Sequence, residues 1–413
     1  MFRVFALAVA SLAAPAFLSA APVVPRFARP TIPLALVPGA AADEIAAGDF
    51  NGDGLVDVII TRLGQEGMQY PVTILINKGN GRFVDATRTI FIGSPPLTQH
   101  PRQIVVADFN GDGRADAFIA DHGTDVPPFP GYQSMLILSQ PGGKLVDATG
   151  DLPQEQAFGH SAAAADVDGN GTVDLFFGPL GRQPQILLND GSGHFRIAAG
   201  ALPSDLTGSY PGSALVDVNG DGSPDLVLAD GDVGGLDRVL LNDGHGDFSF
   251  DSTSLPANSY GANSDGLGIA TGDINGDRRP DLVMASTQQD PFYVGANLQV
   301  LINNGDGTFR DETATRLASE PSPNVRWIAF PQLVDLNGDG KLDLVTHMDG
   351  YPTPPSPVYL NDGNGTFNPV NITAYTRGTW TFVNDKPHQR ARDVLAVSDH
   401  GPSESYIFYR RLN

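Results

Sequence analysis

Short apolar runs alternate with clusters of aspartate, asparagine and glycine along most of the chain. The runs are only a few residues long, as at Val58, Ile59 and Ile60 or at residues 226–228, and turn-forming residues flank them. Such spacing is typical of β-strands rather than of helices. Other runs, such as the alanines at 163–165, consist of small residues that suit an innermost strand crowded around an axis. The pattern therefore predicts an all-β chain.

One nine-residue pattern, Asp-x-Asn-Gly-Asp-Gly-x-x-Asp, recurs six times with small variations. The copies occupy 49–57, 108–116, 166–174, 217–225, 273–281 and 335–343, and their first residues are 59, 58, 51, 56 and 62 positions apart. A repeat of this length that contains short strands is typical of a propeller, in which each repeat forms one blade. The loops join two strands, because an apolar run follows each ninth residue.

The side chains of each loop favour a hard cation. Oxygen ligands at positions 1, 3 and 5, a backbone carbonyl at position 7 and the aspartate at position 9 can surround Ca²⁺, and a donor set without His or Cys disfavours zinc and copper. An EF-hand is excluded because position 12 is never glutamate, and ordinary solvated turns remain the alternative. We predict about six bound Ca²⁺ ions. The predicted ligands are Asp49, Asn51, Asp53, Leu55, Asp57, Asp108, Asn110, Asp112, Arg114, Asp116, Asp166, Asp168, Asn170, Thr172, Asp174, Asp217, Asn219, Asp221, Ser223, Asp225, Asp273, Asn275, Asp277, Arg279, Asp281, Asp335, Asn337, Asp339, Lys341 and Asp343.

The two ends of the chain together predict a seventh blade. Three strand-like runs follow the sixth repeat, at 380–385, 392–397 and 406–413, but no fourth run follows them. The segment at 26–32 resembles the start of a fourth strand at 82–87, so we expect it to complete the last blade and close the ring without a free sheet edge. The loop that begins at Asp385 carries Pro387 and Gln389 at positions 3 and 5, and we expect no metal there.

The calcium loops and the Gly-x-Phe turns that follow most third strands resemble the FG-GAP or VCBS-type repeats, best known from the seven-bladed propeller of integrin α chains. The resemblance covers roughly residues 26–413 and implies a single propeller domain over 22–413. It also implies that the calcium loops lie on one face and that ligands bind on the opposite one. Arg278 replaces glycine at position 6 of the fifth loop, which therefore departs most from a calcium site.

Composition and charge narrow the class of protein. The formal net charge is −22, from 47 acidic and 25 basic residues, and eighteen of the acidic residues are loop aspartates. Six Ca²⁺ would leave about −10. This acidity and the lack of basic runs exclude nucleic acid as a partner and disfavour anionic membranes. Residues 1–21 are predicted to be a secretory signal peptide, with an N-terminal anchor as the alternative. We expect a secreted, periplasmic or cell-surface monomer without membrane insertion, stabilised by calcium because cysteine is absent.

Histidine, arginine and aromatic residues gather in the segments expected opposite the calcium loops. Such a surface suits a glycan or an extracellular protein, so a recognition or adhesion module is the leading hypothesis. Its predicted ligand-binding residues are His122, Trp327, His347, Trp380 and His400. A polysaccharide lyase that uses a His or Tyr base with Arg is the enzyme alternative. Its candidate catalytic residues are His100, Arg102, His160, Tyr210, Arg326 and Tyr351. A passive scaffold, whose loop aromatics only pack locally, is the third possibility.

Overall fold

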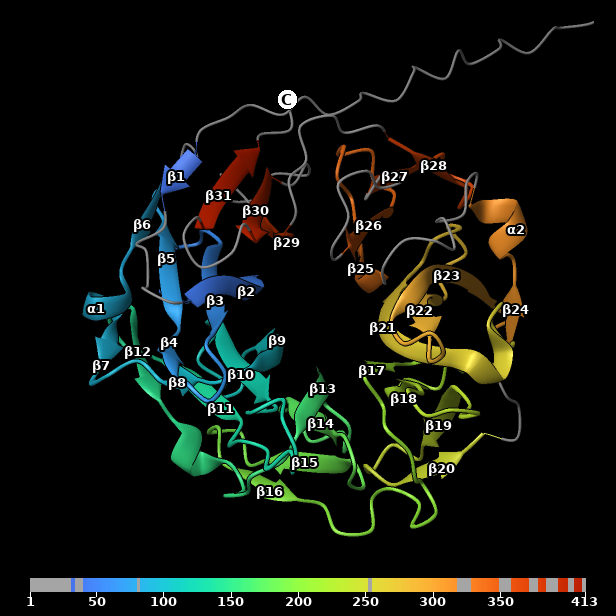
Figure 1. Ribbon diagram of the computed structural model, residues 1–413, viewed down its shortest axis with the longest axis horizontal. Helices are drawn as coiled ribbons and strands as arrows, with labels where there is room; N and C mark the ends of the chain where they lie inside the picture. The colour runs from blue at the N-terminus through green and yellow to red at the C-terminus, as the bar shows by residue number, and fades with distance from the viewer. Residues whose placement is uncertain are drawn as a thin grey trace, which may run out of the picture.

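Short strands form a ring of sheets around a central axis (Figure 1). The computed structural model describes residues 31–33, 40–79, 82–251, 255–317, 328–348, 358–370, 378–383, 393–399 and 405–410. Helical elements in these residues are single turns: α1 (Thr87–Ile90), α2 (Thr313–Arg316), η1 (Thr149–Asp151) and η2 (Gly261–Asn263). The all-β prediction and the propeller arrangement are confirmed. The predicted signal peptide lies outside the described residues, within which no helix is long and apolar enough to cross a membrane.

Six sheets are each built from one consecutive part of the described chain, and their inner-to-outer order follows the sequence. The first contains β2 (Ala40–Gly48), β3 (Asp57–Gly64), β5 (Thr73–Asn77) and β6 (Phe83–Asp85). The second contains β9 (Pro101–Ala107), β10 (Asp116–Asp121), β11 (Met135–Gln140) and β12 (Lys144–Asp147), with β7 (Phe91–Ile92) parallel to β12. The third contains β13 (Gly159–Ala165), β14 (Asp174–Pro179), β15 (Gln185–Asn189) and β16 (Phe195–Ile197).

The remaining three of these sheets repeat the same plan. The fourth contains β17 (Gly212–Val216), β18 (Asp225–Ala229), β19 (Arg238–Asn242) and β20 (Phe248–Phe250). The fifth contains β21 (Ser264–Gly272), β22 (Asp281–Gln288), β23 (Val294–Asn303) and β24 (Phe309–Asp311). The sixth contains β25 (Ile328–Val334), β26 (Asp343–Met348), β27 (Val358–Asn361) and β28 (Phe367–Pro369). Five of the six outer strands begin at a phenylalanine, as the Gly-x-Phe turns predict. A separate two-stranded sheet pairs β4 (Tyr70–Pro71) with β8 (Leu97–Thr98).

One further sheet combines the two ends of the described chain. It contains β29 (Gly378–Val383), β30 (Asp393–Asp399) and β31 (Ser405–Arg410), and β1 (Thr31–Pro33) pairs antiparallel with β31 on its outer side. Thr31 lies opposite Phe408 and Pro33 opposite Tyr406. Six blades therefore come from single consecutive segments, and this composite sheet stands where the sequence places the closing blade. The predicted pairing of an N-terminal strand with the last sheet is confirmed for Thr31 and Ile32, and the rest of the predicted segment, 26–30, lies outside the described residues.

Small residues line the inner strands because neighbouring blades approach one another closely there. The strands β2, β9, β13, β17, β21 and β25 lie side by side around the axis, and β29 contacts both β2 and β26 (Figure 1). A Cβ atom on Gly212 would lie 3.0 Å from the backbone of Gly268 in the next blade. Larger side chains at such positions would force the blades apart.

The hydrophobic core lies between adjacent sheets rather than at one centre. One cluster joins Phe176 and Leu188 of the third sheet to Leu228 and Leu240 of the fourth. Equivalent clusters join the first sheet to the second and the fifth to the sixth. Each blade buries its faces only against its neighbours, and the loops at the two ends of the strands remain available for binding.

Candidate functional site

The two ends of each blade carry different chemistry. In the second blade Ala107 lies opposite Asp116 and Pro101 opposite Asp121, so the loop at 108–116 and the segments around His100 and His122 lie at opposite ends of the same strands. The same register repeats in the other blades with loops of this kind. All six aspartate-rich loops therefore occupy one end of the ring, which we call the loop end.

Each aspartate-rich loop is a series of nested turns that the first aspartate organises. In the fourth loop the Asp217 carboxylate accepts the backbone N–H groups of Gly220 (2.7 Å) and Gly222 (2.9 Å). Asn219 Oδ1 accepts the N–H of Asp221 (2.8 Å), whose own carboxylate accepts that of Ser223 (2.8 Å). The side chains at positions 1, 3 and 5 consequently curl around a common point.

The aspartate at position 9 is fully buried and joins the loop to the third strand. Asp225 accepts the N–H of Val218 through Oδ2 (3.0 Å) and that of Asn242 through Oδ1 (2.9 Å). Burial raises the pKa of Asp225 to about 6, and the nearby Asp221 and Asp217 carboxylates raise it further while these hydrogen bonds lower it. A cation close to such a group would favour its charged form.

The donor set of the loops fits a hard cation. One carboxylate oxygen from each of Asp166, Asp168 and Asp174 lies within 4.8 Å of the others in the third loop. The donors are oxygens throughout, which suits Ca²⁺ better than a transition metal. The second and fifth loops carry a competing cation, because Arg114 lies 2.5 Å from Asp112 and Arg279 lies 2.9 Å from Asp277.

The fifth loop keeps the common backbone despite its arginine. Arg278 adopts φ = 70°, and its N–H donates to Asp273 Oδ2 (2.9 Å) as the glycines at this position do in the other loops. A left-handed backbone costs a residue with a Cβ atom roughly 1–2 kcal/mol. The fifth loop therefore forms, but at an energetic cost that the other five loops avoid because they have glycine at this position.

At the opposite end, one buried carboxylate holds two histidine-bearing segments together. Asp121 ends β10 and accepts the N–H groups of His100 (2.9 Å) and Gly123 (2.8 Å) through Oδ1, and that of Gln99 (2.7 Å) through Oδ2. The N–H of His122 donates to the carbonyl of His100 (3.1 Å). The two imidazole rings lie against one another, with centroids 3.9 Å apart.

Burial keeps this group of histidines neutral. It lowers the pKa of His100 to about 4, with the Arg102 guanidinium adding to the effect. The pKa of His122 is lowered further, by burial first and then by His100, Arg102 and His160. Burial, together with the positive charge of Arg102, also lowers the pKa of His160 well below its usual value. These imidazoles therefore carry no charge at pH 7 and can offer a nitrogen lone pair to a metal ion, whereas the same pKa shifts make them weak proton acceptors.

A cavity of about 690 Å³ opens beside these histidines. Arg102, His122 and His160 line it, and Arg182 enters from the loop after β14. Its remaining lining residues are Asp125, Pro128, Phe129, Pro130, Gln156, Ala157, Phe158, Leu180, Gly181, Phe292 and Tyr293. The volume is within the range of ligand sites.

Aromatic side chains form an exposed rim around this cavity. Phe129 is 49% exposed and Phe292 is 64% exposed, and Phe292 stacks on Tyr293 with centroids 4.1 Å apart. Phe129 and Tyr293 both have positive φ, at 55° and 54°. Non-glycine residues rarely adopt this conformation, and those that do are often found at binding sites. Two of them lie at this one cavity.

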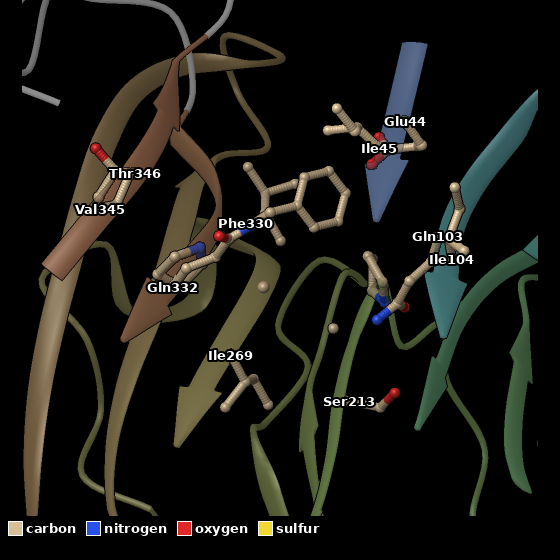
Figure 2. A pocket seen from close by; sticks show the side chains of 15 residues that line it. Glu44, Ile45, Gln103, Ile104, Ser213, Ile269, Phe330, Gln332, Val345 and Thr346 are labelled. Atoms are coloured by element: carbon tan, nitrogen blue, oxygen red, sulfur yellow. The ribbon is translucent and has the colours of Figure 1, made fainter. Parts of the chain in front are cut away.

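A second, smaller cavity of about 180 Å³ lies on the propeller axis. Figure 2 shows Glu44, Gln103, Ser213 and Phe330 reaching toward it from four different inner strands. Burial, with the neighbouring Asp43 carboxylate, raises the pKa of Glu44 to about 8, although Arg102 opposes the shift. The lining of this cavity therefore combines a glutamate that is mostly protonated at pH 7 with polar side chains such as Gln103 and Ser213 and apolar ones such as Phe330.

The structure gathers only some of the residues that the sequence singles out. His100, Arg102, His122 and His160 lie together, with Arg102 and His160 in strands rather than in the expected loops. His347 and Trp380 also lie in strands, opposite Ala329 and Ala396. Tyr210 is buried, and its hydroxyl donates to Thr207 O (2.9 Å) instead of facing the cavity. Arg326, Trp327, Tyr351 and His400 lie outside the described residues.

Sequence reasoning missed several residues of the cavity. Phe129 belongs to a run of prolines at 127–130, and Phe292 follows a proline at the tip of the β22–β23 hairpin. An aromatic residue held in a proline-rich turn is a signal that could have identified both. Arg182 carries no comparable signal, because isolated arginines in turns are common.

The family comparison agrees with the repeat pattern. The model of the FG-GAP-like repeat matches residues 33–119, 166–228, 217–284 and 286–346, more than half of the chain. No curated protein matches the sequence.

Three solved structures match over most of this chain, with low sequence identity and low TM-scores. Saccharomyces cerevisiae Sqt1 matches with 11% identity and a TM-score of 0.46, over 92% of this chain and 99% of that one. The V. cholerae biofilm matrix protein Bap1 matches with 12% identity and a TM-score of 0.35, over 93% and 68%. The exotype rhamnogalacturonan lyase YesX matches with 14% identity and a TM-score of 0.31, over 92% and 59%.

Proposed function

The chain belongs to the family of FG-GAP-like repeat proteins, and from this premise we propose that it is an exported, calcium-binding β-propeller that recognises an acidic glycan. The calcium ions would bind in the six loops at the loop end. The glycan would bind at the opposite end, in the cavity that Arg102, Arg182, Phe129 and Phe292 surround. Separation of the two functions would leave calcium to stabilise the fold without taking part in recognition.

The observation that carries the recognition proposal is the combination of an exposed aromatic rim and two arginines at one cavity. Aromatic rings such as Phe129 and Phe292 offer flat apolar faces to sugar rings. Guanidinium groups bind carboxylates through paired, charge-assisted hydrogen bonds. Arg182 already contacts the carbonyl of Gln156 (2.7 Å) and lies 3.5 Å from Glu155, so its side chain is oriented beside the cavity.

Binding of a soluble polygalacturonate tests this proposal against a neutral dextran. We expect Phe292→Ala to weaken polygalacturonate binding by roughly tenfold, because one stacked aromatic contributes about 0.5–1.5 kcal/mol beyond its buried area. Arg182→Gln should weaken it to a similar degree and reduce its dependence on salt. Val233→Ala is the matched control, since Val233 is 78% exposed and does not line the cavity.

The outcomes separate recognition from the alternatives. Equal affinity for dextran and polygalacturonate, or no loss in either cavity variant, would contradict an acidic-glycan site. Growth of the absorbance of an unsaturated uronate, abolished by His160→Gln, would instead assign lyase activity, because His160 is a neutral base beside Arg102.

Calcium removal tests the other half of the proposal. Each occupied site at 100-fold above its Kd adds about 2.7 kcal/mol if the unfolded chain does not bind. We therefore expect EGTA to lower the melting temperature clearly and added Ca²⁺ to restore it. An unchanged melt, together with elemental analysis that finds no calcium, would contradict the calcium proposal.

A further inference from the structure

Three potential metal ligands converge at the end of the propeller opposite the calcium loops. One ligand atom from each of His100, His122 and Asp125 lies within 4.8 Å of the other two. Ligands about 2.1 Å from a tetrahedral metal are roughly 3.4 Å apart, so small side-chain movements would bring these atoms to coordination distance. His100 precedes β9, and the other two residues follow β10, so adjacent antiparallel strands present all three.

The backbone around these ligands is fixed before any ion binds. Asp121 is fully buried and accepts the N–H groups of His100 and Gly123, and the His122 N–H donates to the His100 carbonyl. Gly123 cannot be replaced easily, because a Cβ atom there would lie 2.8 Å from the backbone of Gly131. A hydrogen bond from the Asp125 N–H to Glu66 holds the third ligand from a neighbouring blade. Such support around the ligands is what metal sites require.

The imidazoles carry nitrogen atoms that the protein does not satisfy. Nδ1 of His100 and Nδ1 of His122 are buried and have no hydrogen-bond partner among the described residues. His122 is only 2% exposed. Buried polar atoms are normally paired, so unpaired ones indicate a partner such as an ion or a water molecule.

We propose that His100, His122 and Asp125 form a binding site for a divalent transition-metal ion of the zinc class, separate from the calcium loops. Two imidazoles and one carboxylate match the ligands that Zn²⁺ and Co²⁺ prefer, whereas Ca²⁺ favours oxygen throughout. Three protein ligands leave a coordination position open. Because His122 and Asp125 line the large cavity, that position would be accessible to an oxygen atom of a bound molecule.

Local charge sets a limit on the affinity. Arg102 lowers the pKa of both His100 and His122 by its positive charge, and it would repel a cation in the same way. The Asp125 carboxylate offsets part of this repulsion. Replacement of Arg102 with glutamine should therefore strengthen metal binding severalfold, although the same change should weaken binding of an acidic glycan. This variant thus changes metal binding and glycan binding in opposite directions. Failure of the metal-site proposal can therefore be told apart from failure of the proposed function.

Titration of the full-length protein with Co²⁺ in the presence of saturating Ca²⁺ tests the site. Co²⁺ ligated by imidazole gives visible absorption, and Ca²⁺ blocks the oxygen-lined loops. We expect about one Co²⁺ per chain, displaced by Zn²⁺. Mutation of a residue that only supports a metal ligand typically weakens metal binding by about tenfold or more. Removal of one of the three ligands should therefore weaken Co²⁺ binding by at least about tenfold.

The variants are chosen so that folding does not confuse the result. His122→Gln removes a buried ligand, and Asp125→Asn removes an exposed one with little risk to the fold. His245→Gln is the control, because His245 is exposed and lies in the turn before β20, away from the cluster. Weaker Co²⁺ binding in Asp125→Asn, together with stronger Co²⁺ binding in Arg102→Gln, would support the site. Absence of Co²⁺ absorption, or equal binding in Asp125→Asn and the parent, would overturn it.

Discussion

A single backbone angle at Arg278 shows how the repeat constrains its residues. The other loops have glycine at this position with φ between 82° and 94°, and Arg278 reaches 70° with a Cβ atom present. Its N–H still donates to the first aspartate of the loop, so the loop geometry takes precedence over the preference of the residue. The strain is local and should be removable by one substitution.

Arg278→Gly should therefore stabilise the protein by about 1 kcal/mol, since glycine adopts positive φ without the steric penalty of a side chain. Thermal melting in the presence of EGTA measures the effect on the chain itself. Arg279→Gln is the control, because it removes a nearby charge without changing the strained position. A melting temperature that stays equal to the parent, or falls, would show that Arg278 compensates its strain through another contact.

The sequence could predict single residues well where the repeat defines them. The aspartates of all six loops were identifiable because six copies share one frame, and their turns form as expected. The histidine cluster was only partly identifiable. His100 and His122 are 22 positions apart in the sequence, and only the register of β9 on β10 brings their rings together. Nothing in the sequence marked Asp125 as a metal ligand, because aspartate is common in turns.

At the scale of the strand, the asparagine that ends most third strands has a structural role that its sequence did not reveal. Asn303 Nδ2 donates to the carbonyl of Val218 in the preceding blade (2.9 Å) and to that of Pro280 in its own blade (3.0 Å). Asn189, Asn242 and Asn361 each reach the preceding blade in the same way. The carbonyl that they contact always belongs to position 2 of an aspartate-rich loop. The asparagine therefore connects one blade to the loop of another.

Asn303→Ala should destabilise the protein by about 3 kcal/mol. The change removes the two donated hydrogen bonds and the one accepted from Gly305, and the buried carbonyl of Val218 loses its asparagine donor. Urea unfolding measures the loss. The adjacent Asn304 is exposed, so Asn304→Ala should change stability by less than about 0.5 kcal/mol. Equal effects of the two substitutions would contradict a specific role for the contact between blades.

At the scale of the whole molecule, the ring closes through the pairing of β1 with β31. The sequence could predict this because the C-terminal segment lacks a fourth strand and the N-terminal segment resembles one. It could not predict the added β7 strand or the cavity opposite the aspartate-rich loops, which depend on how loops from different blades pack. Long-range packing of irregular segments leaves no periodic signal in the sequence.

Deletion of the chain before Gly39 should make the protein prone to aggregation. The deletion removes β1 and exposes the backbone edge of β31, which runs from Ser405 to Arg410 and includes Tyr406, Ile407 and Phe408. An unpaired edge with apolar side chains is a template for pairing with another chain. The parent for comparison begins at residue 22, so that both proteins lack the predicted signal peptide. Size-exclusion chromatography with light scattering should show oligomers, and the melting temperature should fall. A truncated protein that stays monomeric and melts like its parent would mean that β1 is dispensable and that contacts of β29 with β2 and β26 close the ring without it.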